Sequence, residues 1–293
     1  LITGASGNIG GAIVKSLIAH GHQVTSLVRD QAKGEALASL GEHSTFTLLP
    51  IDPSTVDAIV ALAKEHDVFV HNALQFGPEG TELEIRLTRE IIAAGRELEA
   101  AGKSFQFIYT SGCLCTGNTT EPVDESYEGT PFPPAAWRAD LNKETIAASG
   151  TLFVTTVVRP VWVYPSSHID QWIAAAKTHG KISYLEGAEA NYVSLTHLHD
   201  LGNLYTQIIT HRAAGLVHGT DNHPLTVRQL IDKAKEVTGV TEEETYTEPF
   251  AQLQSLGFFA VGQSLTQQVL TSKAQELGWE IAYPNWLDAQ HSH

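Results

Sequence analysis

Three glycines near the start of the chain have the spacing of a phosphate-binding turn. Gly4, Gly7 and Gly10 lie between a short apolar segment, 1–3, and an amphipathic stretch, 9–20. The first glycine permits a tight turn, the second lets the backbone approach a pyrophosphate, and the third lets a helix pack on a strand. The N–H groups of that helix would face the phosphates. This context favours a dinucleotide site over a merely structural turn, formed by Gly4, Ser6, Gly7, Asn8, Ile9 and Gly10.

The next apolar segment, 23–28, ends at two charged residues that bear on cofactor choice. Arg29 follows it directly and Lys33 comes one helical turn later. An acidic residue here binds the ribose hydroxyls of NAD, whereas an arginine accepts the 2′-phosphate of NADP. Arg29 and Lys33 together could hold that phosphate, the arginine through its planar fork. Asp30 competes with this interpretation, because it could pair with Arg29 at the surface. We expect NADP(H) to be favoured over NAD(H).

Further cofactor contacts are expected after the third and fourth apolar segments. Asp52 follows segment 45–49, and its carboxylate could either accept from the adenine amino group or cap the helix after Pro53. Asn72, Ala73 and Leu74 follow segment 68–71. The small side chains among them would let a cofactor lie flat against the edge of the sheet.

The segments that would carry these residues alternate between apolar strands and helical stretches. This alternation is typical of βαβ units on a parallel sheet. We therefore expect an α/β fold, a Rossmann-type doubly wound parallel sheet with a small C-terminal substrate-binding lobe. The expected strands are 1–3, 23–28, 45–49, 68–71, 105–110 and 153–158, and the expected helices are 9–20, 55–64, 80–101 and 137–149.

Beyond Arg159-Pro160 the alternation loosens. Helices are expected near 169–177 and 198–211, strands near 182–185, 192–195 and 216–218, and mostly helical structure after Pro224. The acidic stretch 242–244 is expected to be a solvated surface. We place the NAD(P)-binding domain at 1–160 with the returning segment 196–220, and the smaller lobe at 161–195 and 221–293.

Charge and composition exclude several kinds of partner. Thirty-three Asp and Glu against eighteen Lys and Arg give a formal net charge of -15, which would repel nucleic acid and anionic lipid. No run of about 18 apolar residues predicts a membrane span. Cys113 and Cys115 are too close together for an ordinary structural disulfide, which fits a cytoplasmic protein. No grouping of the 14 histidines with carboxylates resembles a zinc ligand set, so no metal is expected.

Taken in order, the motifs resemble the extended short-chain dehydrogenases/reductases, the group that contains nucleotide-sugar epimerases and dihydroflavonol reductases. The resemblance covers most of the chain. Its segments are 3–10, Arg29 with Lys33, 71–73, 109–112, 121–125, 142–144, 158–160, 163–164, and 192–194 leading to Asp200.

The resemblance implies a particular chemistry. In that family a Ser or Thr follows the fifth strand, and a Tyr four residues before a Lys exchanges a proton with the substrate oxygen while hydride moves to or from the nicotinamide. Lys143 matches the Lys that binds the nicotinamide ribose, but Ala139 occupies the Tyr position and Gly112 that of the usual hydroxyl. The chain therefore resembles an atypical member without the catalytic Tyr. The implied catalytic residues are Ser111 and Lys143, and the further implied cofactor contacts are Thr110, Lys143, Pro160 and Val163.

Several groups could replace the missing acid. Ser111 is one, and the thiols of Cys113 and Cys115 just beyond the fifth strand are others, although such thiols are more often packing residues. Tyr164 offers a phenol. Asp140 could serve only if burial raised its pKa.

Three functions remain open at this point. The first is an NADP-dependent oxidoreductase that acts on a small carbonyl or hydroxyl compound through a non-standard proton donor. The second is a non-catalytic NADP(H)-sensing regulator, which the missing Tyr favours. The third is a nucleotide-sugar epimerase or dehydratase. By analogy with the family, the long helix 80–101 would support a homodimer.

Overall fold

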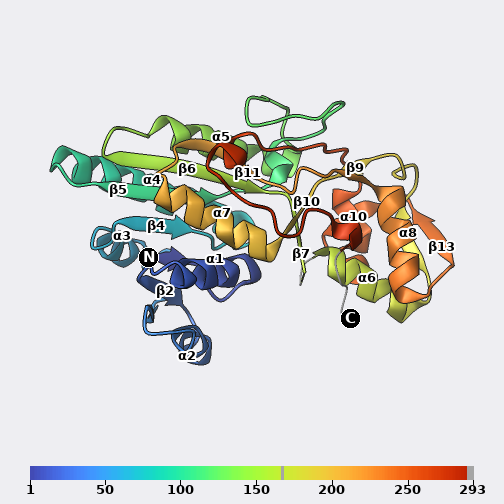
Figure 1. The fold of residues 1–293 in the computed structure, drawn as a ribbon, viewed down its shortest axis with the longest axis horizontal. Coiled ribbons are helices and arrows are strands. Elements are labelled where there is room, and N and C mark those ends of the chain that lie inside the picture. The colour runs from blue at the N-terminus through green and yellow to red at the C-terminus, as the bar shows by residue number, and fades with distance from the viewer. Residues whose placement is uncertain (166–167, 289–293) are drawn as a thin grey trace.

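A seven-stranded sheet forms the centre of the computed structural model, which describes residues 1–165 and 168–288 (Figure 1). Its strand order is β11-β6-β5-β4-β1-β2-β3, and every neighbouring pair is parallel. The order reverses between β1 and β4, which is where doubly wound folds bind ligands, at the carboxyl ends of the strands. The predicted doubly wound parallel sheet is confirmed. The strands are β1 (Ile2–Thr3), β2 (Val24–Val28), β3 (Ser44–Leu48), β4 (Val68–His71), β5 (Phe105–Thr110), β6 (Phe153–Pro160) and β11 (Gly215–Gly219).

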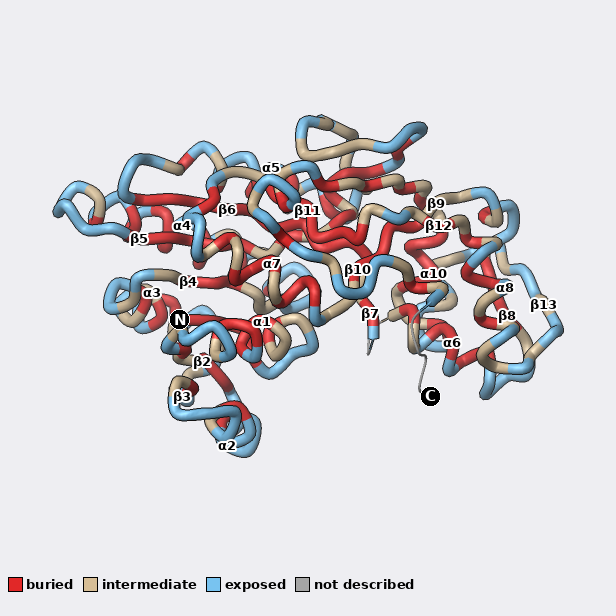
Figure 2. The backbone as a smooth tube through the Cα atoms, viewed as in Figure 1, coloured by how far each residue is buried: buried red, intermediate tan, exposed pale blue. Residues whose placement is uncertain are grey.

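Helices cover both faces of this sheet because its strands are apolar on both sides. Neighbouring residues of one strand point to opposite faces, so Phe107 and Ile108 of β5 belong to different apolar clusters. Figure 2 shows the inner strands β4, β5 and β6 buried along most of their length. On one face lie α1 (Asn8–Ala19) and α7 (Leu198–Thr210), and on the other α3 (Val56–Ala63), α4 (Pro78–Ala100) and α5 (Ala136–Ala147). None of the described helices is both long and apolar enough to cross a membrane.

The chain leaves the sheet after β6 and later returns to it. Helix α7 packs on α1, and β11 pairs with β6. The two helices approach closely at Gly202, where a Cβ atom would lie 2.6 Å from the Ala12 carbonyl oxygen. The first helix of the chain is thus packed against a helix formed much later in the sequence.

The remaining elements form a lobe beyond the carboxyl edge of the sheet (Figure 1). Its core is a separate apolar cluster that contains Trp172, Phe259 and Trp286. Small two-stranded pairs, β10-β7, β12-β9 and β13-β8, surround this core. The elements are β7 (Trp162–Tyr164), α6 (His168–His179), β8 (Ile182–Leu185), β9 (Tyr192–Val193), β10 (Leu195–His197), β12 (Leu225–Thr226), α8 (Val227–Thr238), β13 (Glu243–Tyr246), α9 (Leu253–Leu256), α10 (Phe259–Gly262), and the 3-10 turns η3 (Pro249–Gln252) and η4 (Trp286–Asp288). The short helix α11 (Lys273–Glu276) packs instead on β11 of the central sheet.

The structure differs from the sequence-based expectations in four places. Helix α2 (Gln31–Ala38) was not expected, and it packs on β2 and β3. Strand β7 was not expected either, and it pairs with β10. The expectation of mostly helical structure after Pro224 is wrong at β12 and β13. The solvated surface expected at 242–244 is wrong for Glu243, which is half-buried and bonded to Arg228 and Lys235.

Candidate functional site

The glycine turn joins β1 to α1, and its backbone is packed so closely at Gly4 and Gly10 that no residue with a Cβ atom fits there. Gly4 has a φ of +67°, and a Cβ atom there would lie 2.6 Å from the Asn72 carbonyl oxygen. A Cβ at Gly10 would lie 2.1 Å from the Gly4 carbonyl oxygen. Gly7 is the N-cap of α1, where the amides of the first turn have no carbonyl partner within the helix. Ser6, Gly7 and Asn8 are exposed at this end and Ile9 is half-buried, so an anion can reach the first turn.

The Thr3 hydroxyl joins the glycine turn to the end of β4. It accepts hydrogen bonds from the amides of Asn72 (3.0 Å) and Ala73 (3.3 Å) and lies 2.8 Å from the Nδ1 atom of His71. Burial, together with the charge of Arg138, lowers the pKa of His71 to about 3, so its imidazole is neutral and can accept from Thr3. Two of the predicted cofactor residues, Asn72 and Ala73, are therefore held beside the glycine turn.

The basic residues after β2 are free of the acidic neighbour that competed with them. The Asp30 carboxylate accepts from the Lys33 amide at 2.9 Å and is the N-cap of α2. Among the described residues, Arg29 makes no ion pair, and both Arg29 and Lys33 are exposed. The expected Arg29–Asp30 surface pair is therefore absent from the described structure.

Asp52 has a local partner in the turn before α3. Its Oδ1 atom accepts from the amide (2.8 Å) and the hydroxyl (2.6 Å) of Ser54, and these bonds lower its pKa. The capping alternative is wrong, because the N-cap of α3 is Thr55 and Asp52 only closes the turn onto Ser54; its second carboxylate oxygen is available to a ligand. Leu74, at the end of β4, is exposed.

The predicted catalytic serine lies in a buried polar chain between β5 and α5. The Ser111 side chain is 9% exposed, and its hydroxyl lies 3.5 Å from the Cys115 sulfur. With the Asn142 amide oriented to satisfy its neighbours, the amide nitrogen donates to the Ser111 hydroxyl at 3.0 Å and the amide oxygen accepts from the Arg159 Nε at 3.2 Å. Sequence reasoning missed this use of Arg159, which is 8% exposed and has no carboxylate partner among the described residues. The Arg159 guanidinium thus donates to the same Asn142 amide that donates to Ser111.

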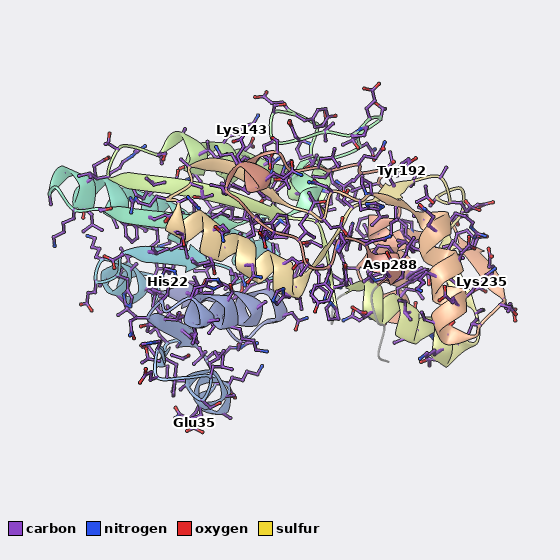
Figure 3. The ribbon with its side chains drawn as sticks, viewed as in Figure 1. His22, Glu35, Lys143, Tyr192, Lys235 and Asp288 are labelled. Atoms are coloured by element: carbon purple, nitrogen blue, oxygen red, sulfur yellow. The ribbon has the colours of Figure 1, made fainter. Side chains whose placement is uncertain are left out.

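Two positions depart from the family pattern, Ala139 and Gly112, and only Gly112 has open space around it. Ala139, at the Tyr position, is buried against Cys115 and Ala135. A Cβ atom at Gly112 would meet nothing within 4 Å. Lys143 is exposed on α5, directly after Asn142, and makes no hydrogen bond to another described residue (Figure 3). Its amine is therefore available to a ligand.

The other candidate acids are engaged or exposed. Burial raises the pKa of the Cys113 thiol to about 12. The Tyr164 hydroxyl is buried and donates to the Tyr283 carbonyl at 3.2 Å, and burial raises its pKa as well. Asp140 is exposed, so the burial that its role required is missing. Of the remaining expected cofactor contacts, Thr110 bonds Tyr205 at 2.6 Å, Pro160 ends β6 and Val163 lies half-buried on β7.

Sequence reasoning also missed a buried ion pair on α5, the helix that carries Asn142. Arg138 donates to both carboxylate oxygens of Glu84, at 2.7 and 2.9 Å, and the Tyr109 hydroxyl donates to the same carboxylate. Burial raises the pKa of Glu84, and Arg138 opposes that shift. Glu84 and Arg138 are 54 residues apart in the sequence, so only the fold brings them together. The pair joins α4 to the first turn of α5, the helix that carries Asn142 and Lys143.

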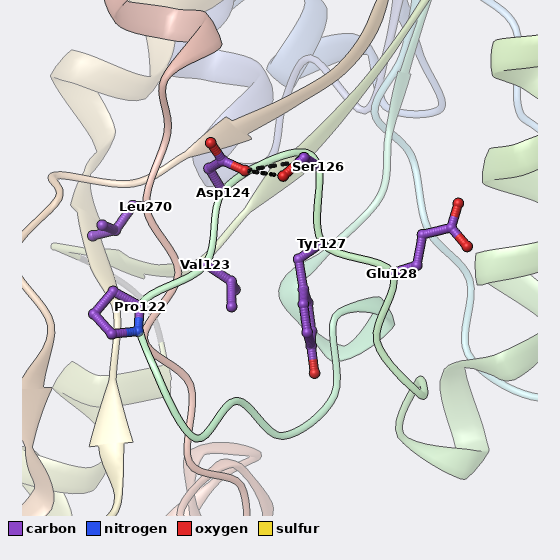
Figure 4. A pocket seen from close by; sticks show the side chains of 7 residues that line it. All are labelled: Pro122, Val123, Asp124, Ser126, Tyr127, Glu128 and Leu270. Atoms are coloured by element: carbon purple, nitrogen blue, oxygen red, sulfur yellow. Dashed lines mark hydrogen bonds between the residues drawn. The ribbon is translucent and has the colours of Figure 1, made fainter.

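An open hollow of about 510 Å³ lies along the loop after β5 (Figure 4). Its lining includes the carboxylates of Asp124 and Glu128, and Asp124 is held by hydrogen bonds from Ser126. None of the expected cofactor residues contributes to it. Nowhere in residues 1–165 and 168–288 do three His, Cys, Asp or Glu side chains come together as metal ligands.

A buried aspartate stands where β11 leads back into the lobe. Asp221 is 4% exposed, and its Oδ2 atom has no partner among the described residues. Burial, followed by the charge of Asp200, raises its pKa to about 8. The folded protein therefore keeps a proton that the unfolded chain loses near pH 4. This group lowers the stability progressively as the pH rises from about 4 to about 8.

We expect Asp221→Asn to remove that pH dependence. The amide keeps the bond that Oδ1 accepts from the His223 amide and carries no titratable proton. Between about pH 5 and pH 7 the stability of the variant relative to the natural chain should rise by about 2 kcal/mol. Urea unfolding of both proteins at each pH measures this difference, from which the histidines common to both cancel. A difference that stays constant with pH would show that Asp221 is ionised in the folded protein.

Comparisons with known proteins agree with this geometry. A family model described as NAD(P)H-binding matches residues 4–183. The 4-hydroxy-2-methyl-3-oxo-4-farnesyl-3,4-dihydroquinoline-1-oxide ketoreductase of Stigmatella aurantiaca is 24% identical over 255 residues, 83% of this chain and 74% of that protein. The structure of the Thermus thermophilus UDP-glucose 4-epimerase with NAD gives a TM-score of 0.73 at 16% identity, covering 96% of this chain and 93% of the other. The human epimerase family protein SDR39U1 (isoform 2) with NADPH gives 0.71 at 17%, covering 97% and 95%.

The residues matched by the family model include the glycine turn. The model covers more than half of the chain and begins in the glycine turn, where Gly4 and Gly10 make the close backbone approaches described above. The solved structures share the fold over nearly the whole chain at low identity. The chain belongs to the NAD(P)H-binding family and has the fold of the extended short-chain dehydrogenases/reductases.

Proposed function

We propose that this protein is an NADP(H)-dependent oxidoreductase that acts on a small carbonyl or hydroxyl compound. The observation that carries the cofactor preference is the environment of Arg29. Its acidic neighbour Asp30 accepts from the Lys33 amide as the N-cap of α2 and forms no ion pair with Arg29, so Arg29 with Lys33 would present positive charge to a 2′-phosphate. In a chain with a net charge of -15, such a local basic spot is what a phosphate-bearing cofactor needs.

The residues around Lys143 support a role in the reaction. Lys143 would hold the nicotinamide ribose, and the backbone after Pro160 would meet the carboxamide. A bound nicotinamide supplies or accepts hydride. Ser111 would donate a hydrogen bond to the substrate oxygen, and the buried Arg159 cation behind Asn142 would strengthen that donation, since charge-assisted hydrogen bonds are stronger than neutral ones. The ketoreductase relative is consistent with carbonyl reduction.

Arg29→Ala should remove the preference for NADPH. Losing one charged contact to the 2′-phosphate should weaken NADPH binding by about 1.5–3 kcal/mol, more than tenfold in affinity, and leave NADH binding unchanged. Calorimetric titration of the natural chain and the variant with both cofactors measures this. Arg96→Ala is the matched control, because Arg96 is exposed on α4, away from β2. Equal affinity of the natural chain for both cofactors would contradict the proposal for NADP.

A second candidate is a non-catalytic protein that senses NADP(H). The burial of Ala139 and Ser111 favours it, because neither the Tyr position nor the serine hydroxyl is openly exposed. NADPH oxidation with a panel of carbonyl compounds separates the two functions. Binding without turnover on any compound, by a protein that is folded, would support the sensor.

A further inference from the structure

Large apolar side chains are exposed at the carboxyl edge of the sheet and on the part of the lobe that meets it. Phe76 is 80% exposed and Leu74 is exposed with it, both in the segment that follows β4. On the lobe, Phe250 of η3 is 54% exposed and Leu253 begins α9. Exposed apolar groups that gather beside a ligand site mark a surface that binds apolar matter.

Contacts across the two parts of the chain make this surface continuous with the site. Phe132, in the loop after β5, stacks on Phe250 with ring centroids 6.3 Å apart and an interplanar angle of 9°. The Phe132 amide donates to the Leu114 carbonyl at 2.9 Å, in the turn that begins two residues after Ser111. The apolar face of η3 therefore reaches the carboxyl end of β5. Since β4 and β5 are parallel neighbours, Leu74 and Phe76 leave the sheet at the same edge.

The cations of the lobe do not face this edge. Four of them are bonded to carboxylates on its outer side: Lys181 to Glu244, Arg228 and Lys235 to Glu243, and Lys233 to Glu236. Bonds from Arg228 and Lys235 lower the pKa of Glu243 to about 2, so its charge is retained near neutral pH.

Lys177 and Lys273, in the same part of the sequence, lie elsewhere. Lys177 is in the last turn of α6, about 14 Å along the helix from His168, whose ring packs on Trp162 of β7. Lys273 lies beside Gly215, where β11 begins, at the opposite edge of the sheet. The open hollow on the near side is lined by carboxylates of Asp124 and Glu128. A substrate diphosphate placed beside Phe132 and Phe250 would therefore meet apolar rings and none of these cations.

We propose that the substrate is a carbonyl compound with a hydrocarbon tail, and that the tail lies on the surface formed by Phe132, Phe250 and Leu253. The compound carries no nucleoside diphosphate. This inference rests on the proposed oxidoreductase function and names its substrate class. The reacting carbonyl would lie by Ser111 and Lys143, and the tail would extend toward η3.

The test is a series of straight-chain 2-ketones, from 2-butanone to 2-nonanone, with NADPH and the full chain. Each methylene that becomes buried should raise kcat/KM about fourfold. Phe250→Ala should lower kcat/KM for 2-nonanone about tenfold more than for 2-butanone. Leu152→Ala is the matched control, because Leu152 is exposed at the amino end of β6, at the opposite edge of the sheet, and should leave the gain per methylene intact.

Calorimetry of the protein saturated with NADP⁺ gives a readout independent of turnover. 2-Nonanone should bind, and UDP-glucose at millimolar concentration should give no heat of binding. Binding of UDP-glucose, no binding of 2-nonanone, or a kcat/KM that is independent of tail length would each overturn the substrate class while leaving a measured NADPH site in place. If NADPH itself does not bind, the proposed function and this inference both fall.

Discussion

Arg138→Ala should lower the free energy of unfolding by about 3–5 kcal/mol. The substitution leaves the Glu84 carboxylate, which is 4% exposed, without its cation and with only the Tyr109 hydroxyl as a partner. A buried charge without a counter-charge is far more costly than the same pair intact. Urea unfolding followed by circular dichroism measures the change.

Two further variants isolate the cause. Arg89→Ala breaks an ion pair with Glu144 that joins the same two helices, α4 and α5, but lies in solvent, so it should change stability by no more than about 1 kcal/mol. Replacing Glu84 and Arg138 together by Leu removes both charges and should recover most of the lost stability. If that double variant is as unstable as Arg138→Ala, the loss comes from packing and not from the uncompensated carboxylate.

Gly10→Ala should abolish NADPH binding and lower the melting temperature. The added Cβ would lie 2.1 Å from the Gly4 carbonyl oxygen and 2.8 Å from the Ala5 Cα, both backbone atoms. Helix α1 must then move away from the turn whose amides are expected to bind the pyrophosphate. Calorimetric titration with NADPH and thermal unfolding measure the two effects.

Its neighbour in the same helix provides the control. A Cβ at Gly11 would lie 3.7 Å from the Ala5 carbonyl oxygen, an ordinary contact. Gly11→Ala should therefore bind NADPH normally and gain up to about 1 kcal/mol of stability from helix propensity. Equal NADPH affinity in the Gly10→Ala and Gly11→Ala variants would show that the close approach of α1 is not needed.

The central sheet could be predicted because its signals are local. Each βαβ unit pairs a short apolar strand with an amphipathic helix, and the strand ranges 68–71 and 105–110 match β4 and β5 residue for residue. Helix α2 could not be predicted from its periodicity because it is short and polar. Its buried face depends on Gly34, which lies against the Phe46 ring of β3. The capping bond from the Lys33 amide to Asp30 was the one local signal that could have revealed it.

The parts that could not be predicted depend on partners far apart in the chain. Strand β13 begins at Glu243, in a stretch that reads as solvated surface until the cations of α8 and the pairing with β8 are known. The Glu84–Arg138 pair and the Asn142–Arg159 bond have the same origin. The family pattern located Lys143 and Ser111 along the sequence, but it gave no indication that an arginine lies behind the serine.

The late return of the chain to its sheet has a consequence for biosynthesis. Strand β6 is paired on one side by β5, and its other edge stays open until β11 has been synthesised. At ordinary rates of translation the ribosome needs about 3–12 seconds to cover the intervening stretch. During that interval β6 presents an uncovered apolar edge, and such edges template association with other chains. The nascent polypeptide is therefore most exposed to aggregation, and most dependent on chaperones, in the interval between the synthesis of β6 and that of β11.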